Sequence, residues 1–221
     1  MKSISNKNIK IKIKMIFSFI SYFNISIFLV LRTIFIPFHK FLAHIKGNKI
    51  LDFGCGHGLF SIYLSYLNKY ELIVGYDIDI NRLNFAKKYI NSNKIKKTIF
   101  NDDENFCFKN SYDSIVIIGV FSLLTDNEIN KILSKLNKVL SSDGVIIVSE
   151  ILKDKSLIYK FHELREKILK KINFTKGSTV LPRTQTEWEN LFIKSGFNNI
   201  NSFSAPVFMH STINLIIKND T

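Results

Sequence analysis

The sequence predicts an α/β fold in which a doubly wound, mostly parallel sheet carries helices on both faces. Three observations predict it. A short apolar run ends in glycines at alternate positions, Gly54, Gly56 and Gly58, and a helical pattern follows directly. Strand-like and helix-like segments then alternate along the next hundred residues, as a doubly wound sheet requires. An acid, Asp77, stands where the second strand of this series ends.

The first strand is expected at residues 48–53, where most side chains are apolar. The glycines after it allow positive φ angles or the close approach of a ligand. From Leu59 onward, apolar residues recur with helical spacing, which predicts a helix over 58–69. Further strands are expected at 71–76, 95–100, 112–118 and 144–150, with helices at 80–91 and 126–140.

The last part of the chain predicts a charged helical stretch and then a closing pair of strands. The charged stretch runs from about residue 155 to 172. Thr184 or Thr186 then caps a helix that ends at Gly196, and Glu187 is placed for a capping box from Thr184. Strands at about 198–204 and 207–217 finish the chain.

Asp77 is the first candidate ligand-binding residue. In a βαβ unit the ligand lies across the carboxyl ends of the strands, where an acid after the second strand meets a ribose. A dinucleotide-binding turn has the spacing G-x-G-x-x-G, but Leu59 stands at the position of the third glycine. The turn therefore indicates a different nucleoside-containing ligand.

Five segments, in order over roughly residues 48–217, resemble the class I S-adenosylmethionine (SAM) dependent methyltransferases, in particular the small-molecule and lipid type (methyltransferase type 11/12-like). The turn D-F-G-C-G-H-G resembles motif I, D-x-G-x-G-x-G. The other segments resemble motif II, the "G-D-A-E-x-L-P-F" stretch, motif IV and the "R-V-L-K-P-G-G" turn with its strand; they are residues 74–79, 100–108, 112–124 and 136–150. The resemblance implies a Rossmann-like, seven-stranded sheet with an antiparallel last strand, and SAM as the cofactor.

The resemblance also implies which residues bind the cofactor. Asp52 and the glycine turn would hold the methionine end, Asp77 would accept both ribose hydroxyls, and Ile78 would pack on the adenine. Asp102 best matches the acid that accepts the adenine amino group, and Asp103 is the alternative because the double acid leaves the register open by one. The full expected set is Asp52, Gly54, Cys55, Gly56, Gly58, Asp77, Ile78, Asp102, Asp103 and Gly119. No metal site is expected.

The catalytic group stays open at this stage. Methyl transfer is an in-line displacement that gains much from positioning, and it needs a base only if the nucleophile must lose a proton. The candidates at the strand tips are Glu150, Ser122 and His57, and Arg183 could clamp an acidic acceptor. Ser122 and Leu123 stand where many small-molecule relatives carry a His pair, which places a His-based step there in doubt.

The positive charge gathers in an N-terminal arm, residues 1–46, ahead of the methyltransferase domain at 47–221. The chain has a formal net charge of +13, yet residues 1–49 hold nine Lys or Arg and no acid. Residues 15–31 are uncharged. Pro37 is expected to open a second short helix that runs to about Ile45. Ser18, Ser21 and Asn24 recur every three residues and would leave a broad apolar face.

Four interpretations of this arm compete. A transmembrane span or a signal peptide would export the domain away from SAM, so both are disfavoured. A lid packed over the substrate pocket and a helix lying on an anionic membrane surface are favoured about equally, and they are compatible. The expected location is cytoplasmic, with peripheral membrane contact through residues 1–46. The insert at about 151–183 is expected to help form the acceptor pocket.

The absence of other motifs narrows the range of possible methyl acceptors. No N/D-P-P-Y/F motif follows the fourth strand, which argues against methylation of exocyclic amines, and no Pro-Cys pair points to cytosine transfer. A small, hydrophobic or lipid-like acceptor is therefore expected, and nucleic acid is disfavoured. Two alternatives stay open: an RNA methyltransferase that grips phosphates with the basic arm, and a SAM-binding protein without catalysis.

Overall fold

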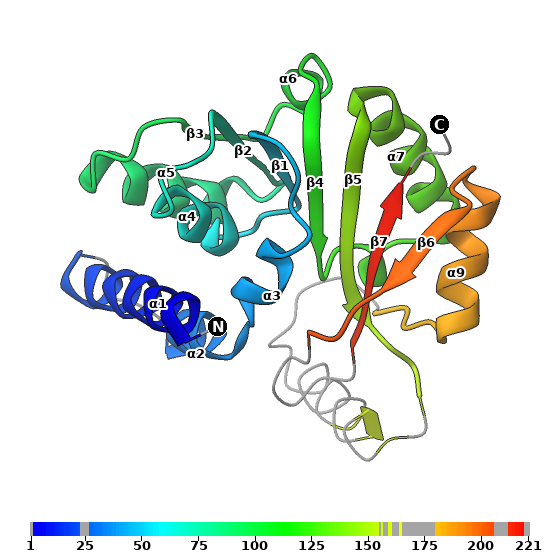
Figure 1. Cartoon of the computed structure of the whole chain (residues 1–221), viewed down its shortest axis with the longest axis horizontal. Helices are drawn as coiled ribbons and strands as arrows, with labels where there is room; N and C mark the ends of the chain where they lie inside the picture. Colours follow the sequence, from blue (N-terminus) through cyan, green and yellow to red (C-terminus); the bar gives the residue numbers. More distant parts are fainter. Residues whose placement is uncertain are drawn as a thin grey trace.

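The computed structural model describes residues 2–22, 27–154, 156, 159–160, 164, 180–205 and 212–218. A seven-stranded sheet forms the centre of the molecule, in the order β3-β2-β1-β4-β5-β7-β6 (Figure 1). Its strands are β1 (Lys49–Phe53), β2 (Leu72–Tyr76), β3 (Thr98–Asn101), β4 (Tyr112–Ile118), β5 (Leu140–Ile151), β6 (Asn199–Ser202) and β7 (Thr212–Lys218). Strands β1 to β5 pair in parallel, and β7 pairs antiparallel with both β5 and β6. The predicted fold, with its antiparallel last strand, is confirmed.

Helices cover both faces of the sheet (Figure 1). They are α1 (Lys2–Tyr22), α2 (Ile27–Phe35), α3 (Phe38–Leu42), α4 (Leu59–Ser65), α5 (Ile80–Ser92), α6 (Glu104–Cys107), the 3₁₀ turn η1 (Phe121–Leu123), α7 (Asp126–Val139) and α9 (Gln185–Lys194). Successive side chains of a strand point to opposite faces. In β5, Val145 and Ile147 therefore join the core beneath α1, α4 and α5, while Ile146 and Val148 join the core beneath α7 and α9.

Two strand boundaries differ from the sequence prediction for local reasons. Strand β3 begins at Thr98 rather than residue 95, because the chain uses Lys94 and Lys97, both with positive φ, to turn away from α5. Strand β5 begins at Leu140 rather than 144. Its first pair, Leu140 with Tyr112, is separated from the rest by a register shift, so Asp143 and Gly144, in the segment that resembles the "R-V-L-K-P-G-G" turn, lie within an irregular strand.

Helix α9 shows which threonine caps it. The Thr184 side chain accepts a hydrogen bond from the Glu187 N–H, and the Glu187 carboxylate accepts one from the Thr184 N–H at 2.7 Å. We expect Thr184→Ala to lower the free energy of unfolding by about 1 kcal/mol. Thr186→Ala, an exposed position inside the same helix, is the control. Urea denaturation measures both, and equal effects of the two changes would contradict the capping role.

The N-terminal arm packs on the body of the molecule. Met15 and Phe19 of α1 and Phe38 and Phe41 of α3 are buried in the core that also contains α4 and α5. Lys12 Nζ donates to the Ile34 and Ile36 carbonyls, at 2.8 and 2.7 Å, and so joins α1 to the end of α2. Pro37 precedes α3 as expected, although α3 ends at Leu42. Within the described part of the chain, no helix is both long enough and apolar enough to span a bilayer.

Candidate functional site

The glycine turn joins β1 to α4 at the carboxyl edge of the sheet. Asp52, near the end of β1, is buried, and its Oδ2 accepts hydrogen bonds from the Ser61 N–H (3.2 Å) and hydroxyl (2.7 Å) in α4. Gly54, Gly56 and Gly58 all have positive φ. A Cβ at Gly54 would lie 2.3 Å from a Val120 methyl group, so the turn needs glycine there for both backbone geometry and space.

Asp77 fixes the tip of this turn. It follows β2, the strand beside β1, and its Oδ2 accepts a 2.7 Å hydrogen bond from the Gly56 N–H. Its Oδ1 accepts from the Asp79 N–H at 2.8 Å. Asp79 in turn caps α5 by accepting from the Asn81 and Arg82 N–H groups. The acid predicted to meet a ribose therefore also holds the loop that would carry the cofactor.

The other predicted adenosine contacts lie along the same edge. Ile78 follows Asp77 directly, and its side chain is 85% exposed. Asp103 caps α6 by accepting from the Asn105 N–H at 2.9 Å. Asp102 is exposed and forms a 3.4 Å ion pair with Lys87. Each of the two acids thus has a partner, and both lie at the edge where the sequence left the register open by one.

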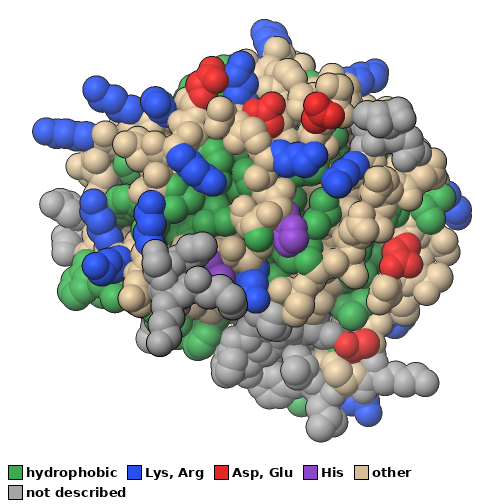
Figure 2. Space-filling model, viewed as in Figure 1, with side chains coloured by type: hydrophobic (Ala, Val, Ile, Leu, Met, Phe, Trp, Pro, Cys, Tyr) green, Lys and Arg blue, Asp and Glu red, His purple; other side chains and the backbone are tan. Residues whose placement is uncertain are grey.

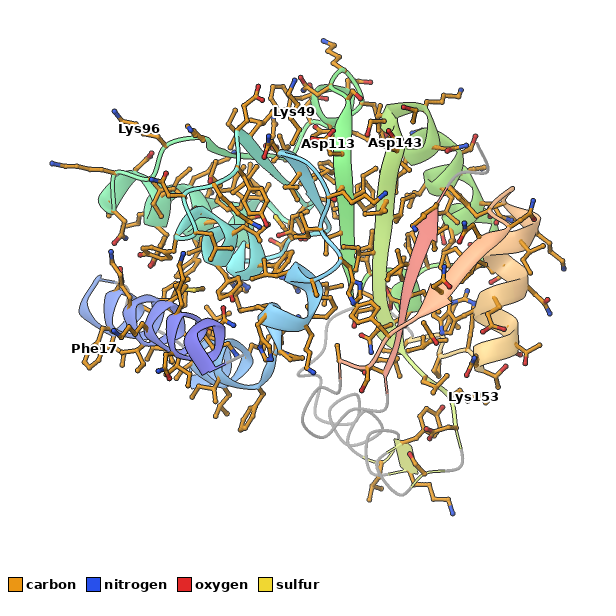
Figure 3. All side chains as sticks on the ribbon, viewed as in Figure 1. Phe17, Lys49, Lys96, Asp113, Asp143 and Lys153 are labelled. Carbon is orange, nitrogen blue, oxygen red and sulfur yellow. The ribbon has the colours of Figure 1, made fainter. Side chains whose placement is uncertain are left out.

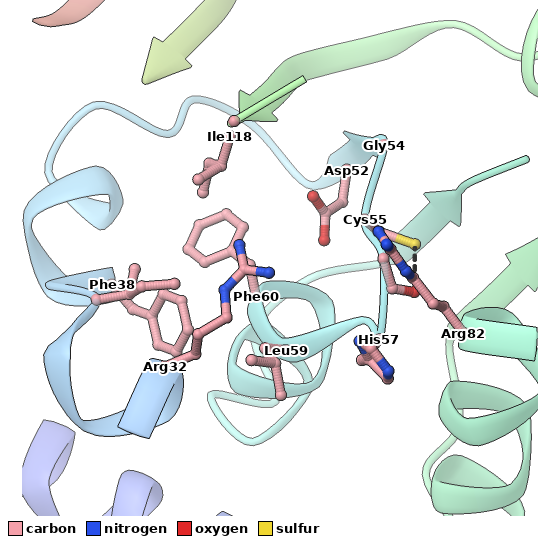
Figure 4. A pocket seen from close by; sticks show the side chains of 13 residues that line it. Arg32, Phe38, Asp52, Gly54, Cys55, His57, Leu59, Phe60, Arg82 and Ile118 are labelled. Carbon is pink, nitrogen blue, oxygen red and sulfur yellow. Dashed lines mark hydrogen bonds between the residues drawn. The ribbon is translucent and has the colours of Figure 1, made fainter. Parts of the chain in front are cut away.

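A pocket opens over the glycine turn, between the turn and the arm (Figure 4). Asp52 and Arg32 point into it from opposite sides (Figure 4). Its lining combines the turn and strand ends with apolar side chains from α3 and α4: Arg32, Ile36, Phe38, Asp52, Gly54, Cys55, Gly56, His57, Leu59, Phe60, Arg82, Ile118 and Gly119. The arm therefore contributes one wall of the pocket.

The carboxyl group of Asp52 has a strongly shifted pKa. Burial raises the pKa of its carboxyl group to about 6, with a smaller contribution from Asp77 and an opposing one from the Ser61 hydrogen bonds. Both hydrogen bonds go to Oδ2, and Oδ1 has no partner among the residues that the structure describes. A buried carboxylate is stabilised by pairing with a positive charge, and the open Oδ1 leaves room for one.

His57 lines the pocket with its ring 5.6 Å from that of Phe85. Burial lowers the pKa of the imidazole, and the neighbouring Arg82 and Arg32 lower it further. A neutral imidazole can accept a proton. Of the three catalytic candidates, His57 is the one among the residues that line this pocket, and its lowered pKa keeps the ring neutral near pH 7.

Glu150 and Ser122 contact each other away from the pocket lining. Glu150 is fully buried, and its four donors are the N–H groups of Val120, Phe121 and Ser122 and the Ser122 hydroxyl, at 2.7 to 3.0 Å. Two donors reach each oxygen, which fills the four lone-pair positions of a carboxylate. Through these contacts Glu150 stabilises the loop that follows β4.

Arg183 also supports that loop. Its guanidinium donates to the carbonyls of Phe121 and Leu124 and to Asp126 Oδ1. It also lies over the Trp188 ring at 4.8 Å. These contacts occupy the guanidinium, so an acidic acceptor is not its partner here. Most of the insert predicted at 151–183 lies outside the described residues.

The sequence analysis considered the arm as a lid over the pocket, but it did not single out Arg32 and Ile36, which line the pocket together with Phe38. A signal for Arg32 was present, because it is the only Lys, Arg, Asp or Glu between residues 15 and 39. Arg82, the second guanidinium in the pocket, pairs with Asp79 at 3.0 Å in the first turn of α5. Nothing in its spacing distinguishes it from an ordinary surface charge.

Comparison with protein families gives a match to the "Methyltransferase domain" model over residues 44–196. The chain belongs to this methyltransferase family. Its fold is that of the class I SAM-dependent methyltransferases, as the sequence predicted. The match begins after α3, so most of the N-terminal arm lies outside it.

The individual relatives of this chain are distant. Ribosomal protein L11 methyltransferase from Thermotoga neapolitana is 28% identical over 67% of this chain and 51% of its own length. Magnesium protoporphyrin IX methyltransferase from Synechocystis PCC 6803, solved with bound SAH, has a TM-score of 0.60 at 16% identity, covering 80% of this chain and 77% of that one. The pyocyanin biosynthetic protein PhzM has a TM-score of 0.68 at 16% identity, covering 92% and 61%. The chain spans 42% to 66% of the first curated relatives it matches.

Proposed function

We propose that this protein transfers a methyl group from SAM to a small, hydrophobic or lipid-like acceptor. The observation that carries the proposal is the pocket in which the glycine turn, the buried Asp52 and the arm meet. Bound SAM would supply an electrophilic methyl group. The protein's task is to hold the acceptor in line with it and to exclude water, which can account for much of the rate.

The residues around the turn fit the cofactor. The open Asp52 Oδ1 suits the ammonium of the methionine end, and the Arg32 and Arg82 guanidinium groups suit its carboxylate. Asp77 lies at the end of β2 for the ribose hydroxyls. Ile78 and Asp102 are accessible for the adenine face and amino group. Gly119, with positive φ and nothing within 4 Å of a built Cβ, borders the same pocket.

An apolar acceptor suits the remaining walls. Ile36, Phe38, Leu59, Phe60 and Ile118 line the pocket beside the turn. Among the described residues that line the pocket, Asp52 is the acid, and it lies at the glycine turn rather than among these apolar side chains. The relatives whose names include small-molecule substrates or products, the porphyrin methyltransferase and PhzM, support the same class. His57 is the group we propose for accepting a proton, if the acceptor releases one.

A ribosomal-protein acceptor is the second candidate, because several curated relatives are named ribosomal protein L11 methyltransferases. Those alignments cover only 35% to 51% of the named proteins. The apolar side chains Ile36 and Phe38, which the arm contributes to the pocket, favour the small-molecule acceptor over this one.

The pH dependence of SAM affinity tests the role of Asp52. The raised pKa of Asp52, about 6, means that the free protein holds the neutral acid below that pH. The ammonium binds the ionised form, so we expect affinity to fall by up to tenfold for each pH unit below about 6 and to level off above it. Calorimetric titration measures this. Asp52→Asn should bind weakly with that slope removed, and an unchanged slope in the variant would assign the titration to another group.

A transfer assay tests the function itself. The protein is incubated with SAM labelled in the methyl group, together with lipid extract, RNA or protein extract, and the label in each fraction is counted. We expect label in the lipid fraction, its loss in Asp77→Asn, and its retention in Asp143→Asn, a matched exposed acid at the other edge of the sheet (Figure 3). Label in RNA or protein would overturn the acceptor class, and SAM binding without transfer to any fraction would overturn the enzymatic function.

A further inference from the structure

Helix α1 turns a stripe of large apolar side chains toward solvent. Ile9, Ile13, Phe17 and Ile20 are spaced so that they share one face, and they are 47% to 66% exposed. Phe17 projects from the outer edge of the molecule (Figure 3). Scattered exposed hydrophobics are ordinary, but a contiguous stripe on one helix marks an interaction site.

The stripe is held in place by the opposite face of the same helix. Ile11, Met15 and Phe19 are buried in the core, with Phe19 and Tyr89 rings 5.0 Å apart. The Lys12 ammonium fixes α1 to the end of α2. The outer apolar face is therefore part of the folded molecule and is presented in a fixed orientation.

Helix α2 adds a second exposed apolar face and links it to the pocket. Leu31, Ile34 and Phe35 are 38% to 47% exposed and share one side of α2. Arg32, on the same short helix, lines the pocket over the glycine turn. A molecule bound on the outer side of α2 is thus within one helix diameter of the pocket.

Positive charge adjoins the apolar stripe. Lys7 and Lys10 lie at helical spacing on an adjoining, exposed side of α1, and the Lys14 ammonium on the same side lies over the Tyr66 ring at 4.8 Å. Lys or Arg side chains and hydrophobic ones lie together over this part of the molecule (Figure 2). Residues 1–49 contain no acid. An apolar face flanked by lysines is the pattern of a helix that lies in the interface of an anionic membrane.

We propose that the outer face of α1 and α2, made of Ile9, Ile13, Phe17, Ile20, Leu31, Ile34 and Phe35, docks on an anionic lipid bilayer. Docking stands independently of the proposed function; only the further step, in which a lipid acceptor passes by α2 into the pocket, rests on it. A second copy of the chain fits less well, because paired arms would bring their lysines together without an acid between them. RNA would engage the lysines but leave the apolar stripe in water.

Vesicle flotation tests the docking. The full chain is mixed with phosphatidylcholine vesicles that do or do not contain phosphatidylglycerol, and the fraction that floats is measured. We expect binding to the anionic vesicles, reduced by about tenfold or more in Lys7→Gln/Lys10→Gln. The matched control, Lys131→Gln/Lys138→Gln, changes exposed lysines of α7 and should bind as wild type.

The apolar contribution is tested separately. Phe17→Ser/Ile20→Ser should lose vesicle binding by about tenfold or more, whereas Ile99→Ser/Ile193→Ser, exposed hydrophobics on β3 and α9, should not. Calorimetric titration with SAM is carried out on the same samples. A variant that binds SAM as tightly as wild type is folded, and its loss of vesicle binding is then independent of cofactor binding. Failure of the wild type to float would overturn the proposal. So would equal loss in stripe and control variants, or a solution dimer that the stripe variants dissociate.

Discussion

Asp77→Ala is expected to weaken SAM binding by about 100-fold or more, the largest effect we anticipate for a single cofactor contact. The variant would lose the two charge-assisted hydrogen bonds that the Asp77 carboxylate would accept from the ribose hydroxyls, each worth roughly 1.5–3 kcal/mol. It would also release the Gly56 N–H, which the carboxylate holds at 2.7 Å, so the turn would lose its anchor. Calorimetric titration with SAM and S-adenosylhomocysteine measures the change.

Two further variants separate the contributions to that loss. Asp77→Asn keeps one oxygen for the Gly56 N–H but removes the charge, so it should bind more tightly than Asp77→Ala and more weakly than wild type. Asp143→Asn, whose side chain is exposed, should bind as wild type. A folded Asp77→Ala protein with wild-type affinity would contradict the cofactor site, and the glycine turn would then need another ligand.

The sheet and its glycine turn could be predicted because local sequence patterns define them. Gly54 and Gly56 have positive φ, which glycine adopts readily, and they stand at alternate positions directly after an apolar run. The continuous apolar runs of β1, β4 and β5 are typical of strands covered on both faces. Such signals lie within a few residues of one another, so a single sequence contains them.

The orientation of the arm could not be predicted in the same way. Its apolar residues occur on every side of α1, and the polar Ser18 was expected to mark a side apart from the apolar face. In the structure Ser18 is buried with a 3.2 Å hydrogen bond to Asn93, while Phe17 faces solvent. Asn8 is likewise buried against the Tyr63 hydroxyl. The choice depends on partners in α4 and α5, some 55 to 75 residues away.

The role of Glu150 was open for a related reason. An acid at the end of a strand in such a sheet faces either the ligand or the adjoining loop, and the sequence does not record which. The decisive contacts come from three consecutive N–H groups, at Val120, Phe121 and Ser122. They converge on one carboxylate only because η1 turns back over the end of β5, and β4 and β5 lie side by side.

Glu150→Ala is therefore expected to lower the free energy of unfolding by roughly 3–5 kcal/mol. Removing the carboxylate leaves three buried N–H groups and the Ser122 hydroxyl without their acceptor, and each such group costs about 1–3 kcal/mol when relaxation is incomplete. Urea denaturation with a folded-state check by circular dichroism measures the change. Glu71→Ala, at an exposed acid in a 3.7 Å surface ion pair, should stay within about 0.5 kcal/mol of wild type.

Glu150→Gln distinguishes this role from catalysis by Glu150. A general base tolerates glutamine structurally and loses its rate, whereas a loop anchor loses stability because an amide nitrogen cannot accept from the donors it faces. We therefore expect Glu150→Gln to be destabilised, by less than Glu150→Ala, with SAM affinity reduced through the displaced loop at Gly119 and Val120. The opposite outcome is a Glu150→Gln protein with wild-type stability and SAM affinity that does not transfer methyl groups. It would indicate that Glu150, rather than His57, accepts the proton.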